Sequence, residues 1–120
     1  MGRDCLRMTT KFKPRTIIIG AGMSGILMGY RLMQAGFDDF TIYEKGESCG
    51  GTWRENTYPG LHCDVKSHSY RYSFAPNPDW TEEFPAGPEI WAYFNRQAEQ
   101  LGVLDHIRFN TEVADGRWDG

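Results

Sequence analysis

The sequence predicts an α/β fold that begins with a strand, a helix and a second strand, and three observations support this prediction. A run of β-branched residues ends at Gly20, and two further glycines, Gly22 and Gly25, follow it. Apolar residues at helical spacing come next, and a second β-rich run ends at Glu44, 19 residues beyond Gly25. Because these features fall within about 30 residues, they indicate a Rossmann-like βαβ unit, whose crossover should be right-handed.

Each element of this unit has its own signal. Arg15–Ile19 is short and rich in isoleucine, which predicts a strand buried on both faces. Gly25–Gln34 carries apolar residues on one helical face, and Gly36 provides a stop just beyond its last turn. Phe40–Tyr43 is the second β run. We therefore expect two parallel strands joined by one helix.

The next part of the chain, residues 45–87, has few periodic signals and many Gly, Pro and aromatic residues. A loop of this length is uncommon in a compact domain unless it is functional, so we expect it to wrap around a ligand. A short helix is predicted near Ser67–Tyr72. Pro88 is suited to the first turn of a longer helix that runs to about Leu101.

This longer helix should bury one face and then lead into the sheet. Its apolar face should contain Ile90, Trp91, Phe94 and Ala98. Gly102 should end the helix. Ile107–Phe109 together with Thr111–Val113 are predicted to be strand, and we expect them to form the next strand of the sheet.

The composition gives no charge-based reason to expect nucleic acid or an anionic membrane as a partner. The 120 residues carry 13 lysines and arginines against 16 acidic residues, a formal net charge of −3. No apolar run reaches the ~18–20 residues of a membrane span, and the N-terminus lacks a secretory apolar core. We therefore expect a cytoplasmic protein with no membrane span.

The cysteines predict neither a metal site nor a disulfide framework. Cys5, Cys49 and Cys63 form an odd set without short metal-ligand spacing. Free thiols in a reducing compartment are the simplest interpretation. A disulfide between Cys49 and Cys63 is the alternative.

The glycine turn predicts a dinucleotide site. Gly20 permits a tight turn, Gly22 lets a pyrophosphate approach the backbone, and Gly25 lets the helix pack close to the strand. Free amide groups at the start of the helix would hold the phosphates. Glu44, at the end of the second strand, would accept hydrogen bonds from the ribose hydroxyls and repel a 2′-phosphate. The site should thus bind FAD or NAD and exclude NADP.

The segment Gly50–Asp64 narrows this choice. It reads Gly-Gly-Thr-Trp-Arg-Glu-Asn-Thr-Tyr-Pro-Gly-Leu-His-Cys-Asp and fits the pattern [A/G]-G-x-W-x4-[F/Y]-P-[G/M]-x3-D at every defined position. In this pattern the chain resembles the Baeyer–Villiger monooxygenases, which are relatives of the flavin-containing monooxygenases. The resemblance extends over about residues 15–113 and includes Tyr70-x-Tyr72-Ser73-Phe74.

The resemblance implies a set of cofactor-binding residues and one catalytic residue. FAD would be bound by Gly20, Gly22, Met23, Ser24, Gly25, Glu44, Gly51, Thr52, Trp53, His62, Cys63, Asp64, Tyr70 and Val113. Val113 would contact the adenine through its backbone, and Tyr70 the flavin. Asp64 would lie near the isoalloxazine ring and help to position an arginine there, while His62 and Cys63 would also border the nicotinamide of NADPH. The implied reaction uses NADPH and O2 to insert one oxygen into a ketone or to oxidise a soft heteroatom.

Several of these residues have simpler interpretations that the sequence leaves open. Trp53 and Tyr58 could be core aromatic residues, and Asp64 could be a turn residue or the N-cap of the short helix that follows it. Cys63 could be a buried packing residue, and His62 an incidental one. His68 and His106 have no partner pattern and should lie on the surface.

Neighbouring flavoprotein classes fit less well. Disulfide reductases carry a Cys-x4-Cys pair after their glycine pair, but Trp53 stands where the first cysteine would be. The Arg-Gly-Gly-Arg run of amine oxidases is missing. An N- or S-oxidising flavin-containing monooxygenase and a non-catalytic dinucleotide-binding fragment remain the alternatives.

The chain is expected to be the N-terminal part of a longer protein. It has one glycine fingerprint, and the second signature of the family, F-x-G-x3-H-x3-W-P, is absent. We expect residues 1–13 to be a flexible leader and residues 14–120 to be a partial FAD-binding domain truncated at its C-terminus. This portion alone should be inactive.

Overall fold

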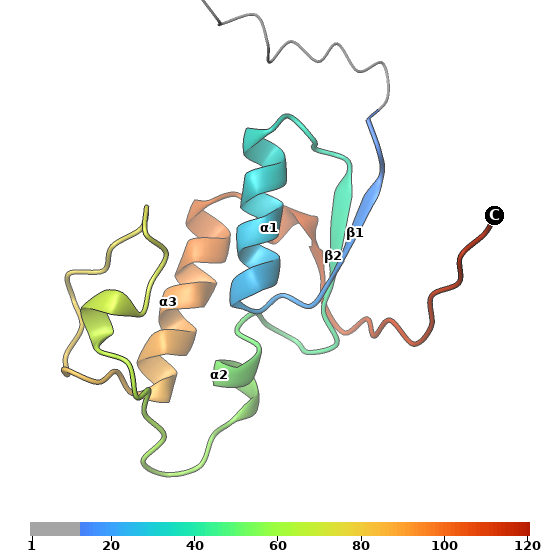
Figure 1. The fold of residues 1–120 in the computed structure, drawn as a ribbon. Coiled ribbons are helices and arrows are strands. Elements are labelled where there is room, and N and C mark those ends of the chain that lie inside the picture. The colour runs from blue at the N-terminus through green and yellow to red at the C-terminus, as the bar shows by residue number, and fades with distance from the viewer. Residues whose placement is uncertain (1–12) are drawn as a thin grey trace, which may run out of the picture.

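A computed structural model describes residues 13–120, so all but the last residue of the expected leader lies outside the described part (Figure 1). Three parallel strands form one sheet in the order β1 (Thr16–Ile19), β2 (Phe40–Tyr43) and β3 (Ile107–Arg108). Helix α1 (Met23–Gln34) connects β1 to β2, and α3 (Gly87–Gln100) precedes β3. The predicted α/β fold with a Rossmann-like βαβ unit is confirmed.

The βαβ unit agrees closely with the sequence pattern. β2 has the predicted bounds, and β1 pairs with it residue for residue from Thr16↔Phe40 to Ile19↔Tyr43. α1 begins two residues earlier than predicted, because Gly22 already occupies its N-cap position. The helix ends as expected at Gly36, which has a φ of +83° and donates its amide to the Met33 carbonyl at 3.0 Å.

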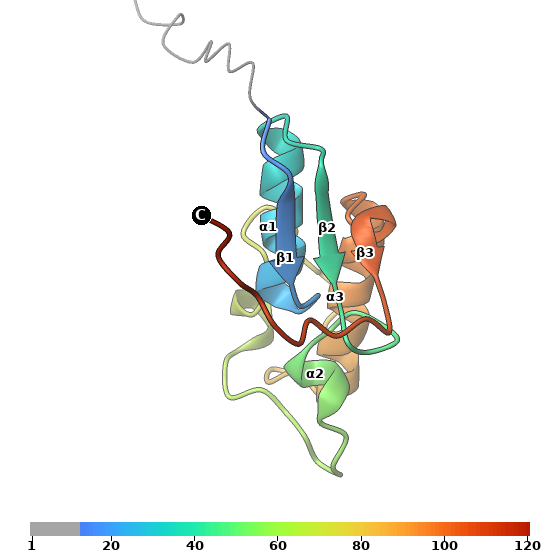
Figure 2. The same ribbon diagram turned by 90° about the vertical axis from the view of Figure 1, so that its right-hand side faces the viewer.

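The core lies between the sheet and the two long helices. Figure 2 shows the sheet in front, with α1 and α3 both behind it. The fully buried members of this core include Ile26, Ile42, Ile90, Phe94 and Val103. Apolar burial between these two layers stabilises the arrangement.

The prediction that β1 is buried on both faces is wrong for the described residues. Its side chains alternate, and Ile17 and Ile19 are 58% and 71% exposed. The physical reason is that α1 and α3 cover the same face of the sheet, and within residues 13–120 no helix covers the opposite face (Figure 2).

Helix α3 starts with Pro88 in its first turn, as predicted, but its buried face was only partly foreseen. Ile90, Phe94 and Ala98 are buried, whereas Trp91 is 38% exposed. Tyr93 takes the core position instead, because residues 90, 93, 94, 97 and 98 share one face at helical spacing. Gly102, with a φ of +76°, ends the helix as expected.

The segment between β2 and α3 contains two short helices that leave most of it irregular. α2 (Thr52–Glu55), which was not predicted, follows two glycines with positive φ, Gly50 and Gly51. A 3-10 turn, η1 (Ser67–Ser69), stands where a short helix was predicted. Most of the segment therefore has no regular backbone pattern.

The region after α3 is less regular than predicted. A second 3-10 turn, η2 (Leu104–His106), leads into β3, which has only two residues, and Thr111–Val113 is not a strand. Asn110 adopts a left-handed φ of 54°, which redirects the chain after β3.

His106 is also more buried than expected. Its ring stacks on Phe40 with 4.0 Å between centroids, and its Nδ1 lies 3.1 Å from the Phe40 carbonyl oxygen. His106 is therefore partly buried, because η2 turns its ring towards β2.

Candidate dinucleotide-binding site

The glycine turn lies at the carboxyl ends of β1 and β2, where its backbone is tightly constrained. The Gly20 amide donates to the Tyr43 carbonyl at 2.8 Å, and Gly20 has a φ of +93° that favours glycine. A Cβ added to Gly25 would stand 1.9 Å from the Gly20 carbonyl oxygen. Glycine is thus required at residue 25 by close packing of helix and turn, as the sequence predicted.

The start of α1 presents backbone donors that no side chain caps. Gly22 is the N-cap residue, and it has no side-chain hydrogen bond to the first turn. The first turn contains Met23 and Ser24, which are both exposed, and the buried Gly25. Free amide groups at the positive end of a 12-residue helix form a ready site for an anion such as a pyrophosphate.

Glu44 connects the glycine turn to the end of β2. Its side chain is only 5% exposed, and its two carboxylate oxygens accept the amides of Ala21 at 2.7 Å and Gly46 at 2.8 Å. Each oxygen keeps a further lone pair for another donor. Glu44 thus has a structural role that the sequence did not reveal, in addition to the ribose contact predicted for it.

Two adjoining hollows surround the turn and share Ile19, Gly20, Gly22 and Gly51. The first, of about 350 Å³, is also lined by Met23, Ser24, Gly25, Gly50, Thr52, Trp53 and Tyr70. The second, of about 290 Å³, is also lined by Tyr43, Glu44, Lys45, Glu55, Thr111, Glu112 and Val113. Together they form one extended groove with the glycine turn at its middle, which suits a dinucleotide whose pyrophosphate lies over the turn.

Close approach of two glycine segments shapes the middle of this groove. The Gly50 amide donates to the Ala21 carbonyl at 3.0 Å, and a Cβ on Gly22 would lie 3.6 Å from the Cα of Gly51. The glycine pair of the fingerprint therefore lies directly beside the first glycine turn. This contact joins two parts of the sequence that were predicted to bind one cofactor.

The far end of the first hollow is aromatic. The indole Nε1 of Trp53 donates to the Tyr70 hydroxyl at 2.9 Å, and their rings meet edge to face at 5.8 Å and 82°. Trp53 is partly buried, whereas Tyr58 is 61% exposed, so the core position considered for Tyr58 is wrong.

The second hollow is closed by residues that follow β3. The Thr111 amide donates to the Glu44 carbonyl at 2.9 Å, which places Val113 along the same hollow as Glu44. Lys45 and Glu55 also line this hollow and form an ion pair at 3.4 Å. Sequence reasoning missed these two residues, although the position of Lys45 directly after Glu44 was an available signal.

His62, Cys63 and Asp64 line neither of these two hollows. Asp64 is exposed, and η1 has Lys66 at its N-cap without a side-chain hydrogen bond, so the capping role considered for Asp64 is wrong. Cys63 is buried at 6% exposure, as a packing residue would be. The three residues are thus placed next to each other but apart from the groove.

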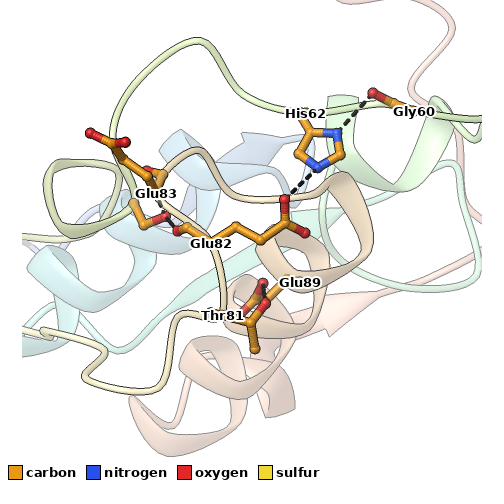
Figure 3. Close-up of polar contacts among 7 residues, drawn as sticks. Gly60, His62, Thr81, Glu82, Glu83 and Glu89 are labelled. Atoms are coloured by element: carbon orange, nitrogen blue, oxygen red, sulfur yellow. Dashed lines mark hydrogen bonds and ion pairs between the residues drawn. The ribbon is translucent and has the colours of Figure 1, made fainter.

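Both ring nitrogens of His62 face acceptors (Figure 3). Nδ1 lies 2.8 Å from the Gly60 carbonyl oxygen, and Nε2 lies 3.0 Å from Oε2 of Glu82. Neither partner can donate, so both contacts require the doubly protonated imidazolium. These two contacts raise the pKa of His62 above its ordinary value, and the Gly60 carbonyl is the larger cause and the Glu82 carboxylate the smaller.

The cysteines of the described chain are free thiols. Cys49 and Cys63 are both buried and unpaired, so the disulfide considered between them is wrong. Burial raises the pKa of Cys49 to about 11, which keeps the thiol protonated and unreactive.

Within residues 13–120, no group of three or more His, Cys, Asp or Glu residues could hold a metal ion. No helix there is both long and apolar enough to cross a membrane.

The parallel sheet, the glycine turn with its uncapped helix and the acidic residue after β2 define a dinucleotide-binding domain. The chain belongs to the family of NAD(P)-binding Rossmann-like domains, and the model of this family matches residues 18–96.

Its relatives confirm the resemblance to Baeyer–Villiger monooxygenases. The FAD-binding monooxygenase moxY of Dothistroma septosporum is 47% identical over 107 residues, which are 88% of this chain and 17% of moxY. A Baeyer–Villiger monooxygenase of Pseudomonas aeruginosa is 48% identical over 105 residues, 88% of this chain and 20% of the relative. The chain thus spans about a fifth of the length of these relatives.

Solved structures agree with the fold. A crystal structure of OTEMO in complex with FAD and NADP matches 87% of this chain and 20% of its own, with a TM-score of 0.81 and 39% identity. Oxidized steroid monooxygenase bound to NADP matches 80% of this chain and 19% of its own, with a TM-score of 0.75 and 34% identity.

Proposed function

We propose that this chain is the FAD-binding portion of an NADPH-dependent flavin monooxygenase of the Baeyer–Villiger type. The observation that carries the proposal is the continuous groove around Gly20, Gly22 and Gly51, with uncapped helix amides at its middle and Glu44 in its second hollow. Its parts meet the needs of FAD: donors for the pyrophosphate, a carboxylate for the ribose and an aromatic end for the flavin.

In this proposal each part of the groove binds one part of FAD. The amides of Met23, Ser24 and Gly25 hold the pyrophosphate, and the backbone of Val113 contacts the adenine. Gly51, Thr52, Trp53 and Tyr70 lie along the flavin side. FAD supplies the redox chemistry with O2, while the protein orients it and excludes water.

The proposed organic substrate is a ketone or a soft heteroatom compound, with NADPH as the reductant. Asp64 is the proposed catalytic residue, as an electrostatic organiser of an arginine outside this sequence. His62 and Cys63 would border the nicotinamide. Asp64 is exposed in the structure, so its carboxylate is accessible to such a partner.

We also propose that residues 14–120 form one part of the FAD-binding domain, with residues 1–13 as a leader. A cytoplasmic location is proposed as well, because Cys49 and Cys63 remain free thiols.

Cofactor titration of the protein tests the FAD proposal. Quenching of flavin fluorescence and a shifted visible band should appear with FAD, and NADH should compete only weakly. Gly22→Ala provides a matched variant, because Gly22 has a φ of −82° and its added Cβ would meet only ordinary contacts. We expect Gly22→Ala to stay folded and to bind FAD about tenfold more weakly or worse, since its methyl group stands where the pyrophosphate approaches. A colourless protein that takes up only NAD would favour the non-catalytic alternative.

The role of Asp64 is tested in the longest natural polypeptide that contains this chain. Asp64→Ala should retain FAD and still oxidise NADPH with O2, but release peroxide instead of oxygenated product. Asp64→Glu, which keeps the charge, should recover part of the coupling. Unchanged coupling in Asp64→Ala would remove Asp64 from the mechanism.

Oxidation of amines or sulfides with no product from ketones would favour the flavin-containing monooxygenase alternative.

A further inference from the structure

Trp53 separates two hollows of the molecule. Its side chain lines the 350 Å³ hollow at the glycine turn, and it also lines a third hollow of about 580 Å³. The third hollow lies between α2, the loop after it and the start of α3, and its apolar lining includes Tyr58, Leu61 and Trp91. Trp53 is the one residue that the two hollows share, so the position of its indole sets the shape of both.

The backbone around Trp53 provides little to fix this indole. Helix α2 has only four residues, and the glycines Gly50 and Gly51 precede it with φ values of +129° and +50°. A single helical turn of this kind is only marginally stable by itself. Something beyond local structure must therefore hold the ring.

The Tyr70 hydroxyl supplies that constraint. It accepts the indole N–H at 2.9 Å, which is the hydrogen bond that the structure gives this group. Tyr70 is itself held firmly, because its amide bonds to the carbonyls of Lys66 and Ser67 at 3.1 Å each. Its ring also packs edge to face against Phe94, which is fully buried in α3.

We propose that Tyr70 is a positioning residue that acts on the flavin side of the groove through Trp53. Its hydroxyl fixes the indole that bounds the cofactor hollow, so that the core of α3 sets the shape of the cofactor site. The proposal rests on FAD being the ligand. It differs from a direct flavin contact by Tyr70, because the effect of the hydroxyl then depends on Trp53 being present.

A double-mutant cycle distinguishes these two roles. Tyr70→Phe removes one oxygen atom, and Trp53→Phe removes the indole N–H while keeping an aromatic ring. In the longest natural polypeptide that contains this chain, Tyr70→Phe should weaken FAD binding about threefold to tenfold, the range of one hydrogen bond. It should also change the visible circular dichroism of the bound flavin. In the Trp53→Phe background, the same substitution should change neither quantity.

Equal losses from Tyr70→Phe in both backgrounds would overturn the proposal and support direct contact. No loss in the wild-type background would overturn the proposal as well. A second measurement needs no cofactor. The indole N–H resonance of Trp53 should move upfield in Tyr70→Phe, and an unchanged resonance would overturn the proposal. A wild-type protein that binds no FAD contradicts the proposed function instead, so the two failures are distinguishable.

Discussion

The βαβ unit, residues 16–44, and the segment that follows it, residues 45–86, are stabilised by different kinds of interaction. The first is held by ladder hydrogen bonds between β1 and β2 and by the burial of Ile26 and Ile42. The second has few hydrogen bonds of regular helix or strand, and side chains bind its backbone in addition to the hydrogen bonds of its turns. The Tyr93 hydroxyl accepts the Tyr72 amide at 3.0 Å and donates to the Ala75 carbonyl at 2.6 Å.

This difference separates two tasks within one cofactor site. The βαβ unit provides a rigid turn, whose geometry follows from a few glycines and a helix start. The following segment provides the aromatic end of the groove, and its shape depends on α3, which comes later in the chain. Tyr72 joins the two regions, because its hydroxyl donates to the Met23 carbonyl in the first turn of α1 at 2.5 Å.

The largest effect is expected from Gly25→Ala in the βαβ unit. The new Cβ would stand 1.9 Å from the Gly20 carbonyl oxygen, so the turn or the helix must move. We expect a loss of about 3 kcal/mol or more in the free energy of unfolding, measured by urea denaturation. Gly36→Ala is the control: it has a φ of +83° but open space around it, and it should cost about 1 kcal/mol. A loss in Gly25→Ala no larger than that in Gly36→Ala would show that the turn and the helix absorb the added methyl group, and would contradict close packing as the reason for glycine at residue 25.

Tyr93→Phe, in α3, should be the single-atom change with the largest effect on the following segment. The substitution removes the hydroxyl that binds both the Tyr72 amide and the Ala75 carbonyl. The Tyr93 side chain is fully buried. We expect a loss of about 2 kcal/mol in the free energy of unfolding. Among residues 13–120 the Tyr30 hydroxyl bonds only to the exposed Gln34, so Tyr30→Phe should change stability by about 0.5 kcal/mol or less. A Tyr93→Phe loss no larger than this would show that aromatic packing alone holds the segment.

The smallest effect concerns pH and the contact between His62 and Glu82. The charged groups around this contact are Glu83, which pairs with Lys66, and Glu89, which binds Thr81 (Figure 3). Because the folded pKa of His62 is raised, its contribution to stability is fully present below the ordinary value of 6.5 and is lost as pH rises through the folded pKa.

An NMR titration of the His62 ring should show this raised pKa. Glu82→Gln should move the pKa of His62 back towards 6.5 without reaching it, because the Gly60 carbonyl contact, the larger cause, remains. A titration unaffected by Glu82→Gln would mean that the carboxylate contributes nothing to the protonation of His62.

Much of the fold was predictable because its signals are local. β2, the end of α1 at Gly36 and the start of α3 at Pro88 each follow from residues within a few positions of the boundary. The same holds for the glycine turn, where sequence spacing directly sets the geometry. The family resemblance then extended the prediction to Gly51 and Trp53, which do line the groove.

Other features could not be predicted, because they depend on segments distant in the sequence. The exposure of Ile17 and Ile19 depends on which face of the sheet α1 and α3 cover.

By itself, the sequence determined the βαβ unit and the residue types of a dinucleotide site, since both are encoded over short distances. Tertiary structure alone decided that Glu44 binds Ala21, that Tyr70 binds Trp53, and that Asp64 lies apart from the groove. The Glu44–Ala21 contact depends on the pairing of β1 with β2, and the Tyr70–Trp53 contact depends on how α3 packs against the segment before it. No local pattern records either arrangement.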